Sequence, residues 1–225
     1  MSQELTSGVL AGKRLILGVS GGIAAYKACD LASRLVKEGA QVTAVLTRGG
    51  RRFVTPHSFQ ALTGNPCLTA MFHRIRQGDS AYPHLDPVKN ADLVVLAPAT
   101  ANLMARLAAG MADDVLTALC LSAACPIVVC PAMNVRMWEH PATQRNIRTL
   151  TGFGCRILGP ATGRLACGEE GIGRMLEPAD IVDGLHVLLS APPDDGKHAD
   201  PGARVRVRRR SARKRKPNKG DSSTT

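Results

Sequence analysis

Short apolar runs alternate with amphipathic segments along most of the chain, and this pattern predicts strands and helices in turn. Five apolar runs indicate strands, at residues 14–19, 41–46, 92–97, 127–130 and 155–158. Apolar residues at helical spacing indicate helices at residues 23–36, 101–123 (broken near Gly110), 141–150 and 177–189. Because strands joined by helical crossovers pair in parallel, we predict an α/β fold with an open, doubly wound parallel sheet.

The pattern stops after Ser190. Residues 191–225 lack apolar periodicity and hold eleven of the 29 Lys and Arg residues but only four of the 18 Asp and Glu residues, so they carry most of the net charge of +11. We therefore predict a single folded domain followed by a disordered basic tail. A solvated tail is the favoured interpretation. Contact with nucleic acid, an acidic protein or anionic lipid is the alternative, although the tail lacks interleaved aromatic residues.

Composition sets further bounds. The chain has 225 residues, of which 44% are hydrophobic, and this suits one globular domain. No run approaches the roughly 20 apolar residues of a membrane span, and the N-terminus lacks a signal-peptide layout, so we expect a cytoplasmic protein without a membrane partner. The seven cysteines are an odd number without paired C-x-x-C spacing. This argues against a disulfide framework and against a zinc site, and we predict no metal.

The candidate chemistry lies just after the predicted strands, because ligands of doubly wound sheets bind at the carboxyl ends of the strands. The turn Ser20-Gly21-Gly22-Ile23 opens a helix and suits a phosphate, but a purely structural turn would look the same. It fits neither the dinucleotide fingerprint nor the P-loop. The other segments at strand ends are residues 47–48, 98–102, 131–134 and the loop 163–174.

Individual side chains in and near these segments each have two interpretations. Thr100 or Asn102 either caps a helix or binds a ligand. His84 is either a surface residue or a general base, since its ordinary pKa is near 6.5. Asn134 either caps a turn or holds a carboxylate or a flavin carbonyl through its NH₂ group. Cys167 is either an inert thiol or a proton donor in a mobile, Gly-rich segment that closes over substrate.

Taken together, these segments resemble the phosphopantothenoylcysteine decarboxylases, which belong to the homo-oligomeric flavin-containing cysteine decarboxylase family. The resemblance covers residues 12–190, which we take as the domain, and leaves residues 191–225 as the tail. The matching motifs are VSGGIAAYK from Val19, FVTP from Phe53, FQALTG from Phe59, ADLVVLAPATAN from Ala91, PAMNVRMW from Pro131, and ACG to GRMLEP from Ala166.

The resemblance implies a Rossmann-like, flavodoxin-type fold, FMN as cofactor, and a homo-oligomer built from trimers with sites between subunits. It also implies decarboxylation of 4′-phospho-N-pantothenoylcysteine to 4′-phosphopantetheine in coenzyme A biosynthesis, through reversible oxidation of the cysteine by the flavin without net redox change. The residues that it assigns to FMN binding are Gly21, Gly22, Ile23, Leu46, Thr47, Arg48, Pro98, Ala99, Thr100, Ala101 and Ala132.

The resemblance also gives roles to three side chains. His84 matches the active-site His, which assists thiol deprotonation or orients the substrate. Asn134 matches the Asn that holds the substrate carboxylate, and Cys167 matches the proton-donating Cys. Pro87 departs from the family's pattern and alters the segment after His84. Many bacterial relatives continue into a ligase domain, whereas this chain has the basic tail, so we expect a decarboxylase that needs a separate ligase.

Three other functions fit parts of the same pattern. A peptidyl-cysteine decarboxylase of a lantibiotic-type pathway shares the flavin chemistry and is the main rival. A flavin prenyltransferase shares the Gly-rich turn but would lack the PxMN and ACG motifs. A non-catalytic regulatory flavoprotein that inhibits a phosphatase generally has a long acidic tail, and the basic tail here together with His84, Asn134 and Cys167 favours catalysis. In the PAMNVRMW segment, we expect Met133, Met137 and Trp138 to pack a corner and a subunit contact.

Overall fold

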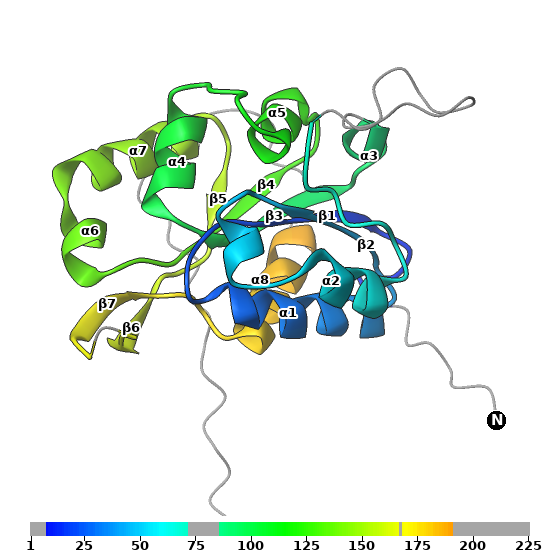
Figure 1. Cartoon of the computed structure of the whole chain (residues 1–225), viewed down its shortest axis with the longest axis horizontal. Coiled ribbons are helices and arrows are strands. Elements are labelled where there is room, and N and C mark those ends of the chain that lie inside the picture. Colours follow the sequence, from blue (N-terminus) through cyan, green and yellow to red (C-terminus); the bar gives the residue numbers. More distant parts are fainter. Residues whose placement is uncertain (1–7, 72–85, 167, 191–225) are drawn as a thin grey trace, which may run out of the picture.

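A five-stranded parallel sheet forms the centre of the computed structural model, which describes residues 8–71, 86–166 and 168–190 (Figure 1). The strand order is β2-β1-β3-β4-β5, and all four neighbouring pairs are parallel. This is the order of flavodoxin-like doubly wound sheets. The bounds of the strands are β1 Arg14–Val19, β2 Gln41–Leu46, β3 Leu93–Ala99, β4 Ile127–Pro131 and β5 Arg156–Ile157.

Helices cover both faces of this sheet (Figure 1). The helices on one face are α1 Ala25–Lys37, α2 Pro56–Thr63 and α8 Pro178–Ser190. Those on the other face are α3 Asp86–Lys89, α4 Ala101–Ala108, α5 Val115–Ser122 and α7 Pro141–Gly152. Three smaller elements complete the chain, namely the 3-10 turn η1 Gly50–Arg52, the short helix α6 Val135–Glu139, and a hairpin of β6 Ala161–Arg164 and β7 Glu170–Arg174.

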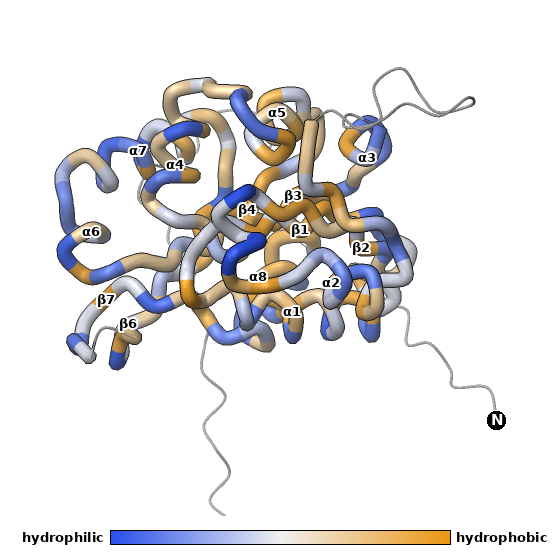
Figure 2. Tube along the Cα trace, viewed as in Figure 1, coloured by the Kyte–Doolittle hydropathy of each residue, from blue (hydrophilic) through white to orange (hydrophobic). Residues whose placement is uncertain are grey.

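Alternate residues of the strands supply two separate hydrophobic cores. In β1, Leu15 and Leu17 pack toward α1 and α8, whereas Ile16 packs toward α4 and α5. Burial on both faces explains why the strands are apolar throughout, and Figure 2 shows them as the most hydrophobic part of the trace. Gly18 lets the α5 layer approach, since a Cβ there would lie 2.5 Å from the Leu116 side chain.

The predicted α/β fold is confirmed, and the five predicted strands occur with small shifts at their ends. The helical pattern over 101–123 is two helices, as the Gly110 break predicted. Gly110 has a φ of +69° after α4, and α5 starts at a capping box in which Asp114 and Thr117 each bond the other's backbone N–H.

The interpretation of residues 163–174 as a loop is wrong, because most of this segment is the antiparallel hairpin β6–β7. Alternation of apolar residues is weak here, since Gly163, Gly171 and Gly173 have no side chains to alternate. We also did not predict the short helices α2, α3 and α6. Thr55, which caps α2, and Pro56 at its first position form a recognisable helix start. The expected disorder of residues 191–225 lies outside the described residues and stays a prediction.

Candidate active site

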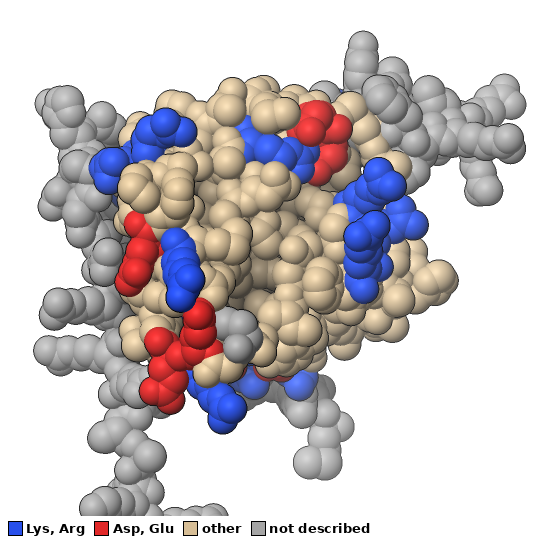
Figure 3. Space-filling view, turned by 60° about the vertical axis from the view of Figure 1, so that its left-hand side comes forward, with Lys and Arg blue, Asp and Glu red and all other residues tan. Residues whose placement is uncertain are grey.

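The candidate site is a pocket of about 990 Å³ at the carboxyl ends of β1, β3 and β4. The chain leaves β1 toward the α1 face of the sheet and leaves β3 toward the α4 face. Strands that diverge in this way open a crevice between them, and in doubly wound sheets this is where ligands bind. Figure 3 shows the hollow from this side, with mostly uncharged residues inside and charged side chains around its rim.

Ser20 joins the two diverging strands at the base of the pocket. Its buried hydroxyl donates to the carbonyl oxygen of Pro98 at 2.7 Å and accepts from the backbone N–H of Thr100 at 3.0 Å. The backbone N–H of Ser20 also donates to Pro98, at 3.2 Å. The turn after β1 therefore has a fixed position relative to the start of α4.

The Gly-rich turn lies against a second backbone turn so closely that only glycine fits. A Cβ on Gly21 would lie 2.7 Å from the Cα of Gly49, and a Cβ on Gly50 would lie 2.5 Å from the carbonyl oxygen of Val19. No side chain caps the start of α1, and its first turn holds no acidic residue. The positive end of the α1 dipole thus faces the pocket and is suited to an anion.

Thr47 and Arg48 form the adjoining wall after β2. The buried hydroxyl of Thr47 donates to the carbonyl oxygen of Val19 at 3.3 Å and accepts from the backbone N–H of Gly50 at 3.0 Å. These bonds fix the segment that leads into η1. Arg48 lines the pocket and contributes a positive charge to it.

Thr100 is the residue that caps α4, which answers the question left open between Thr100 and Asn102. Its hydroxyl accepts from the backbone N–H of Leu103 at 3.3 Å and lies 3.2 Å from the hydroxyl of Ser20. Thr100 also lines the pocket, so capping and a place in the site are compatible. Asn102 is exposed on the first turn of α4 and lines the pocket too.

The structure brings most of the expected FMN-contact residues to this one pocket. The eight that line it are Gly21, Gly22, Ile23, Thr47, Arg48, Thr100, Ala101 and Ala132. Leu46, Pro98 and Ala99 are buried in the sheet beneath it. Of these three, Pro98 supports the site through the carbonyl oxygen that accepts from Ser20.

Asn134 caps helix α6 and faces the hairpin. Its Oδ1 accepts from the backbone N–H of Arg136 at 2.8 Å, and its Nδ2 donates to Oε2 of Glu169 at 2.6 Å. The cap fixes the orientation of the amide, because the oxygen must face the helix. The NH₂ group is thereby directed to the side of the pocket that β6–β7 covers.

The hairpin packs against the strand end that carries Asn134. The backbone N–H of Met133 donates to the carbonyl oxygen of Gly173 at 2.9 Å. A Cβ on Gly173 would clash with the Met133 carbonyl oxygen, and one on Gly171 would lie 2.9 Å from Val135. Two glycines of the ACG-to-GRM segment are therefore required by close packing.

Two of the three apolar residues in PAMNVRMW pack as expected. Trp138 is buried, and Met133 is half-buried against the core under α4 and α7. Met137 is 49% exposed and lines the pocket, so it does not pack the corner within this chain, whereas its expected part in a subunit contact stays a prediction.

The two remaining predicted residues, His84 and Cys167, lie outside the described residues. Leu165 and Ala166, which precede Cys167, line the pocket. The helix α3, which begins two residues after His84, lies at the opposite end of the molecule from α6 and the hairpin (Figure 1). No residue of α3 lines the pocket.

The charged side chains at the mouth were not singled out from the sequence. Lys27 Nζ lies 2.8 Å from Oε1 of Glu177, and Arg174 Nη1 lies 3.4 Å from the same oxygen. On another side, Arg106 pairs with Asp113 and with Asp114, the latter at 2.9 Å. These pairs join α1 to the start of α8, and α4 to α5. Lys27 belongs to the GGIAAYK motif, which is the signal that would have found it.

The six cysteines among the described residues are free and serve as small apolar residues. Burial raises the pKa of Cys120 and Cys130 to about 12 and that of Cys155 to about 11. Such thiols stay protonated at neutral pH and are poor nucleophiles. Within the described residues there is no cluster of metal-ligating side chains, and no helix is long and apolar enough to cross a membrane.

Comparison with known proteins identifies relatives over most of the chain. The model of the flavoprotein family matches residues 4–190. The coenzyme A biosynthesis bifunctional protein CoaBC of Vibrio parahaemolyticus is 45% identical over 196 residues, which cover 82% of this chain and 49% of that protein. The chain thus spans about half the length of the curated relatives that it matches.

Solved structures show the same arrangement. A PPC decarboxylase mutant complexed with pantothenoylaminoethenethiol aligns with a TM-score of 0.72 and 28% identity, over 80% of this chain and 100% of that one. The FMN-dependent cysteine decarboxylase SpaF aligns with a TM-score of 0.67 and 33% identity, over 81% of this chain and 99% of that one. The flavodoxin-type fold expected from the sequence is confirmed by these similarities.

Proposed function

This chain belongs to the flavoprotein family, and we propose that it is an FMN-dependent decarboxylase that converts 4′-phospho-N-pantothenoylcysteine to 4′-phosphopantetheine for coenzyme A biosynthesis. One observation carries the proposal. The pocket at the strand switch point joins a helix start that is suited to an anion to an amide, Asn134, that is suited to a carboxylate. Its similarity to CoaBC and to PPC decarboxylase supports the choice of substrate.

The pocket fits FMN on features of its own. The backbones at Gly21 and Gly49 approach so closely that a side chain would fill the cradle, and the uncapped start of α1 suits the phosphate. The residues that would hold the cofactor are Gly21, Gly22, Ile23, Thr47, Arg48, Thr100, Ala101 and Ala132. When bound, FMN supplies a two-electron acceptor that also returns the electrons, so that the cysteine gains a temporary electron sink.

Asn134 would hold the substrate carboxylate by its NH₂ group. A neutral amide suits this role, because it binds the carboxylate by hydrogen bonds and leaves CO₂ free to depart without a cationic partner. The Asn134 Oδ1 accepts a hydrogen bond from the backbone at the start of α6, and this bond holds the side chain in one orientation. The NH₂ group therefore has a fixed direction before the substrate binds. Orientation of this kind lowers the entropy cost of reaching the reactive geometry.

Cys167 and His84 would supply the proton transfers. Cys167 would donate the proton that completes the product, and its neighbours Leu165 and Ala166 already line the pocket. His84 would assist deprotonation of the substrate thiol or orient the substrate. Sites between subunits, which the resemblance implies, would allow His84 of a neighbouring copy to act in this pocket.

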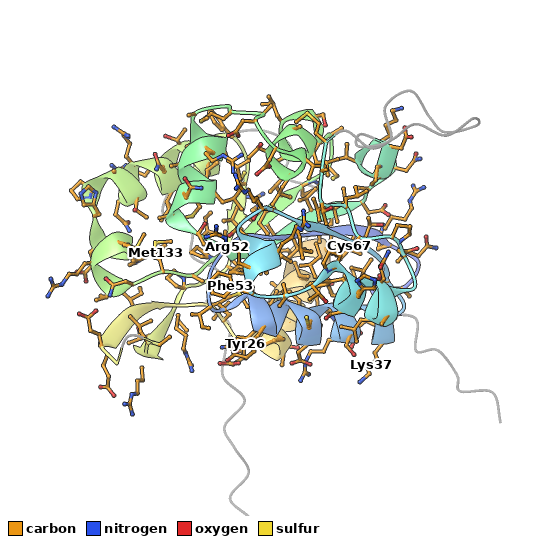
Figure 4. The ribbon with its side chains drawn as sticks, in the orientation of Figure 1. Tyr26, Lys37, Arg52, Phe53, Cys67 and Met133 are labelled. Carbon is orange, nitrogen blue, oxygen red and sulfur yellow. The ribbon has the colours of Figure 1, made fainter. Side chains whose placement is uncertain are left out.

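We also propose a homo-oligomer built from trimers, as the resemblance implies. Large apolar side chains are exposed beside the pocket, where a second copy would cover them. Ile23 and Tyr26 are 60% and 61% exposed, and Phe53 is 47% exposed. In Figure 4, Tyr26, Phe53 and Met133 lie toward the carboxyl ends of the strands, away from Lys37 and Cys67. A cytoplasmic location stays a prediction.

The direct test uses the purified full chain. We expect a yellow protein with an FMN spectrum that releases CO₂ and phosphopantetheine from phosphopantothenoylcysteine. Turnover of a peptide with a C-terminal cysteine, without turnover of this substrate, would assign the chain to the peptidyl-cysteine decarboxylases. FMN binding without turnover of either substrate would favour a regulatory flavoprotein. In the Cys167→Ser variant, formation of the reduced product at the normal rate would rule out the proton-donor role.

A further inference from the structure

The amide proposed to hold the substrate carboxylate already holds a carboxylate of the protein. Asn134 Nδ2 donates to Oε2 of Glu169 at 2.6 Å, a close hydrogen bond between an amide and a carboxylate. Glu169 is the second residue after Cys167 and lies next to the first residue of β7. It belongs to the same segment that carries the expected proton donor.

The backbone holds Glu169 in this place. Its carbonyl oxygen accepts from the backbone N–H of Leu165 at 2.8 Å, which closes the turn between β6 and β7. Two residues further on, Gly171 packs against Val135, and Gly173 bonds to Met133. The hairpin is therefore attached to α6 on both sides of Asn134 in the sequence, and the Glu169 side chain spans the remaining gap.

We propose that Glu169 is a further residue of the substrate site, whose carboxylate occupies the substrate-carboxylate position in the substrate-free enzyme and competes with the substrate for it. The substrate must take the Asn134 amide from it, so binding is an exchange of one carboxylate for another. This inference rests on the proposed function, because it takes Asn134 as the group that holds the substrate carboxylate.

The exchange has a consequence for the two ends of the reaction. The substrate carries a carboxylate that competes with Glu169, whereas the product has lost this carboxylate as CO₂. Once CO₂ has left, the Glu169 carboxylate can again accept the hydrogen bond from the Asn134 NH₂ group. The product has no carboxylate and does not compete for this hydrogen bond. Competition by Glu169 thus weakens binding of the substrate, which carries a carboxylate. It has no direct effect on binding of the product, which carries none.

The size of the effect follows from the fraction of molecules in which Asn134 is available. The apparent affinity for a ligand that needs the amide is reduced by this fraction. If Glu169 holds the amide in about nine molecules of ten, its removal strengthens binding of a carboxylate ligand about tenfold. A ligand without a carboxylate gains nothing, because it does not use the amide.

The test compares two unreactive ligands on the FMN-loaded protein. One is the serine analogue of the substrate, which keeps the carboxylate but has a hydroxyl in place of the thiol that is oxidised. The other is its ethanolamine counterpart, which lacks the carboxylate. We would measure both dissociation constants by calorimetry for wild type, Glu169→Ala, Glu169→Gln and the control Glu170→Ala. Glu170 is the exposed neighbour of Glu169 and lies opposite Arg164 in the register of the hairpin, whereas the hydrogen bond from the Asn134 amide goes to Glu169.

We expect Glu169→Ala to bind the serine analogue about tenfold more tightly and the ethanolamine analogue unchanged. Glu169→Gln keeps an acceptor oxygen for Asn134 but loses the charge, so its gain should be smaller. Glu170→Ala should match wild type. Weaker binding of the serine analogue by Glu169→Ala would overturn the proposal, because Glu169 would then be orienting Asn134 for the substrate. An equal change for both analogues would also overturn it.

The outcomes separate this inference from the proposed function. If wild type turns over phosphopantothenoylcysteine but Glu169→Ala binds the serine analogue more weakly, the function stands and the role of Glu169 falls. If wild type shows no turnover but the variant gains affinity for the serine analogue alone, the role of Glu169 stands. Failure of wild type and variant to bind either analogue would overturn the inference.

Discussion

The hydroxyl of Ser20 bonds to the carbonyl oxygen of Pro98 at 2.7 Å, across the point where the chain leaves the sheet toward opposite faces. The two residues are 78 positions apart in the sequence. The same hydroxyl accepts from the backbone N–H of Thr100, so one side chain satisfies two backbone groups at the base of the pocket. A serine that looks like part of a Gly-rich turn is thus a connection between two strand ends.

We expect Ser20→Ala to destabilise the fold and loosen the cofactor pocket. The change leaves the carbonyl oxygen of Pro98 with one bond fewer and the N–H of Thr100 without its acceptor, which should cost about 1–3 kcal/mol of unfolding free energy. Urea unfolding and FMN titration would measure the two effects. Ser122→Ala, at an exposed residue that only bonds its own helix, is the control and should change neither by more than about 0.5 kcal/mol. Equal stability of the two variants would contradict this account.

We expect Gly21→Ala to lose FMN affinity. The added methyl group would lie 2.7 Å from the Gly49 backbone, so one of the two turns must shift from the position that shapes the pocket. We expect a loss of at least about tenfold in FMN affinity, measured by fluorescence quenching, since a misplaced turn forfeits well-oriented N–H donors. Gly152→Ala is the matched control, because a Cβ there meets nothing within 4 Å and lies in α7. It should bind FMN as wild type does. An FMN affinity for Gly21→Ala within twofold of that control would refute the close-approach argument.

We expect Asn134→Asp to abolish decarboxylation and retain FMN. Aspartate caps a helix as well as asparagine does, so α6 should persist, but the NH₂ donor is lost and two carboxylates then face each other at the Glu169 contact. Activity should fall by about a hundredfold or more, in line with the loss of a positioned donor in an active site. The measurement is CO₂ release with the FMN content determined in parallel.

The double variant Asn134→Asp with Glu169→Gln separates the two effects. Without the repulsion between the two carboxylates, the free energy of unfolding should rise by about 1 kcal/mol relative to Asn134→Asp. Activity should stay low, because the NH₂ donor of Asn134 is still missing. Recovery of activity in the double variant would show that repulsion, and not loss of the amide, had inactivated the single one.

We expect the contribution of Asp92 to stability to depend on pH. The backbone N–H of Arg14 donates to its Oδ2 at 2.8 Å, and with the nearby Lys13 this holds the pKa of the Asp92 carboxyl below its usual range. A carboxyl with a lowered pKa in the folded state stabilises above its unfolded pKa, and this stability is lost as the pH falls through the folded pKa. The effect should be below about 1 kcal/mol, because the side chain is one-third exposed.

The test compares the unfolding free energy of wild type and Asp92→Asn from neutral pH down to about pH 3. Wild type should be the more stable at neutral pH, and the difference should shrink below about pH 4. Asp30→Asn, at an exposed residue of α1 that pairs with Arg34, serves as the control. A difference between wild type and Asp92→Asn that stays constant over the whole range would exclude the electrostatic explanation.

The strands and the main helices were predictable because their signals are local. A strand buried on both faces must be apolar throughout, as in residues 93–97, and a surface helix must repeat its apolar residues every three to four positions. The hairpin escaped prediction because its packing depends on Gly171 and Gly173, which leave no alternating pattern. Likewise, the short helix α6 has only five residues, too few for a helical period to be recognised.

The place of the site was also determined by the sequence, since polar and Gly-rich segments follow strands whose carboxyl ends must meet at one edge of a parallel sheet. What each side chain does there was decided only by the tertiary structure. The hydrogen bond from the Leu103 N–H to the Thr100 hydroxyl identifies Thr100, and not Asn102, as the residue that caps α4. The amide of Asn134 is bonded to Glu169, which lies 35 residues away in the sequence. Sequence patterns report which residues share an element or an edge. Hydrogen bonds between distant segments depend on distances of a few tenths of an ångström, and these exist only once the chain has folded.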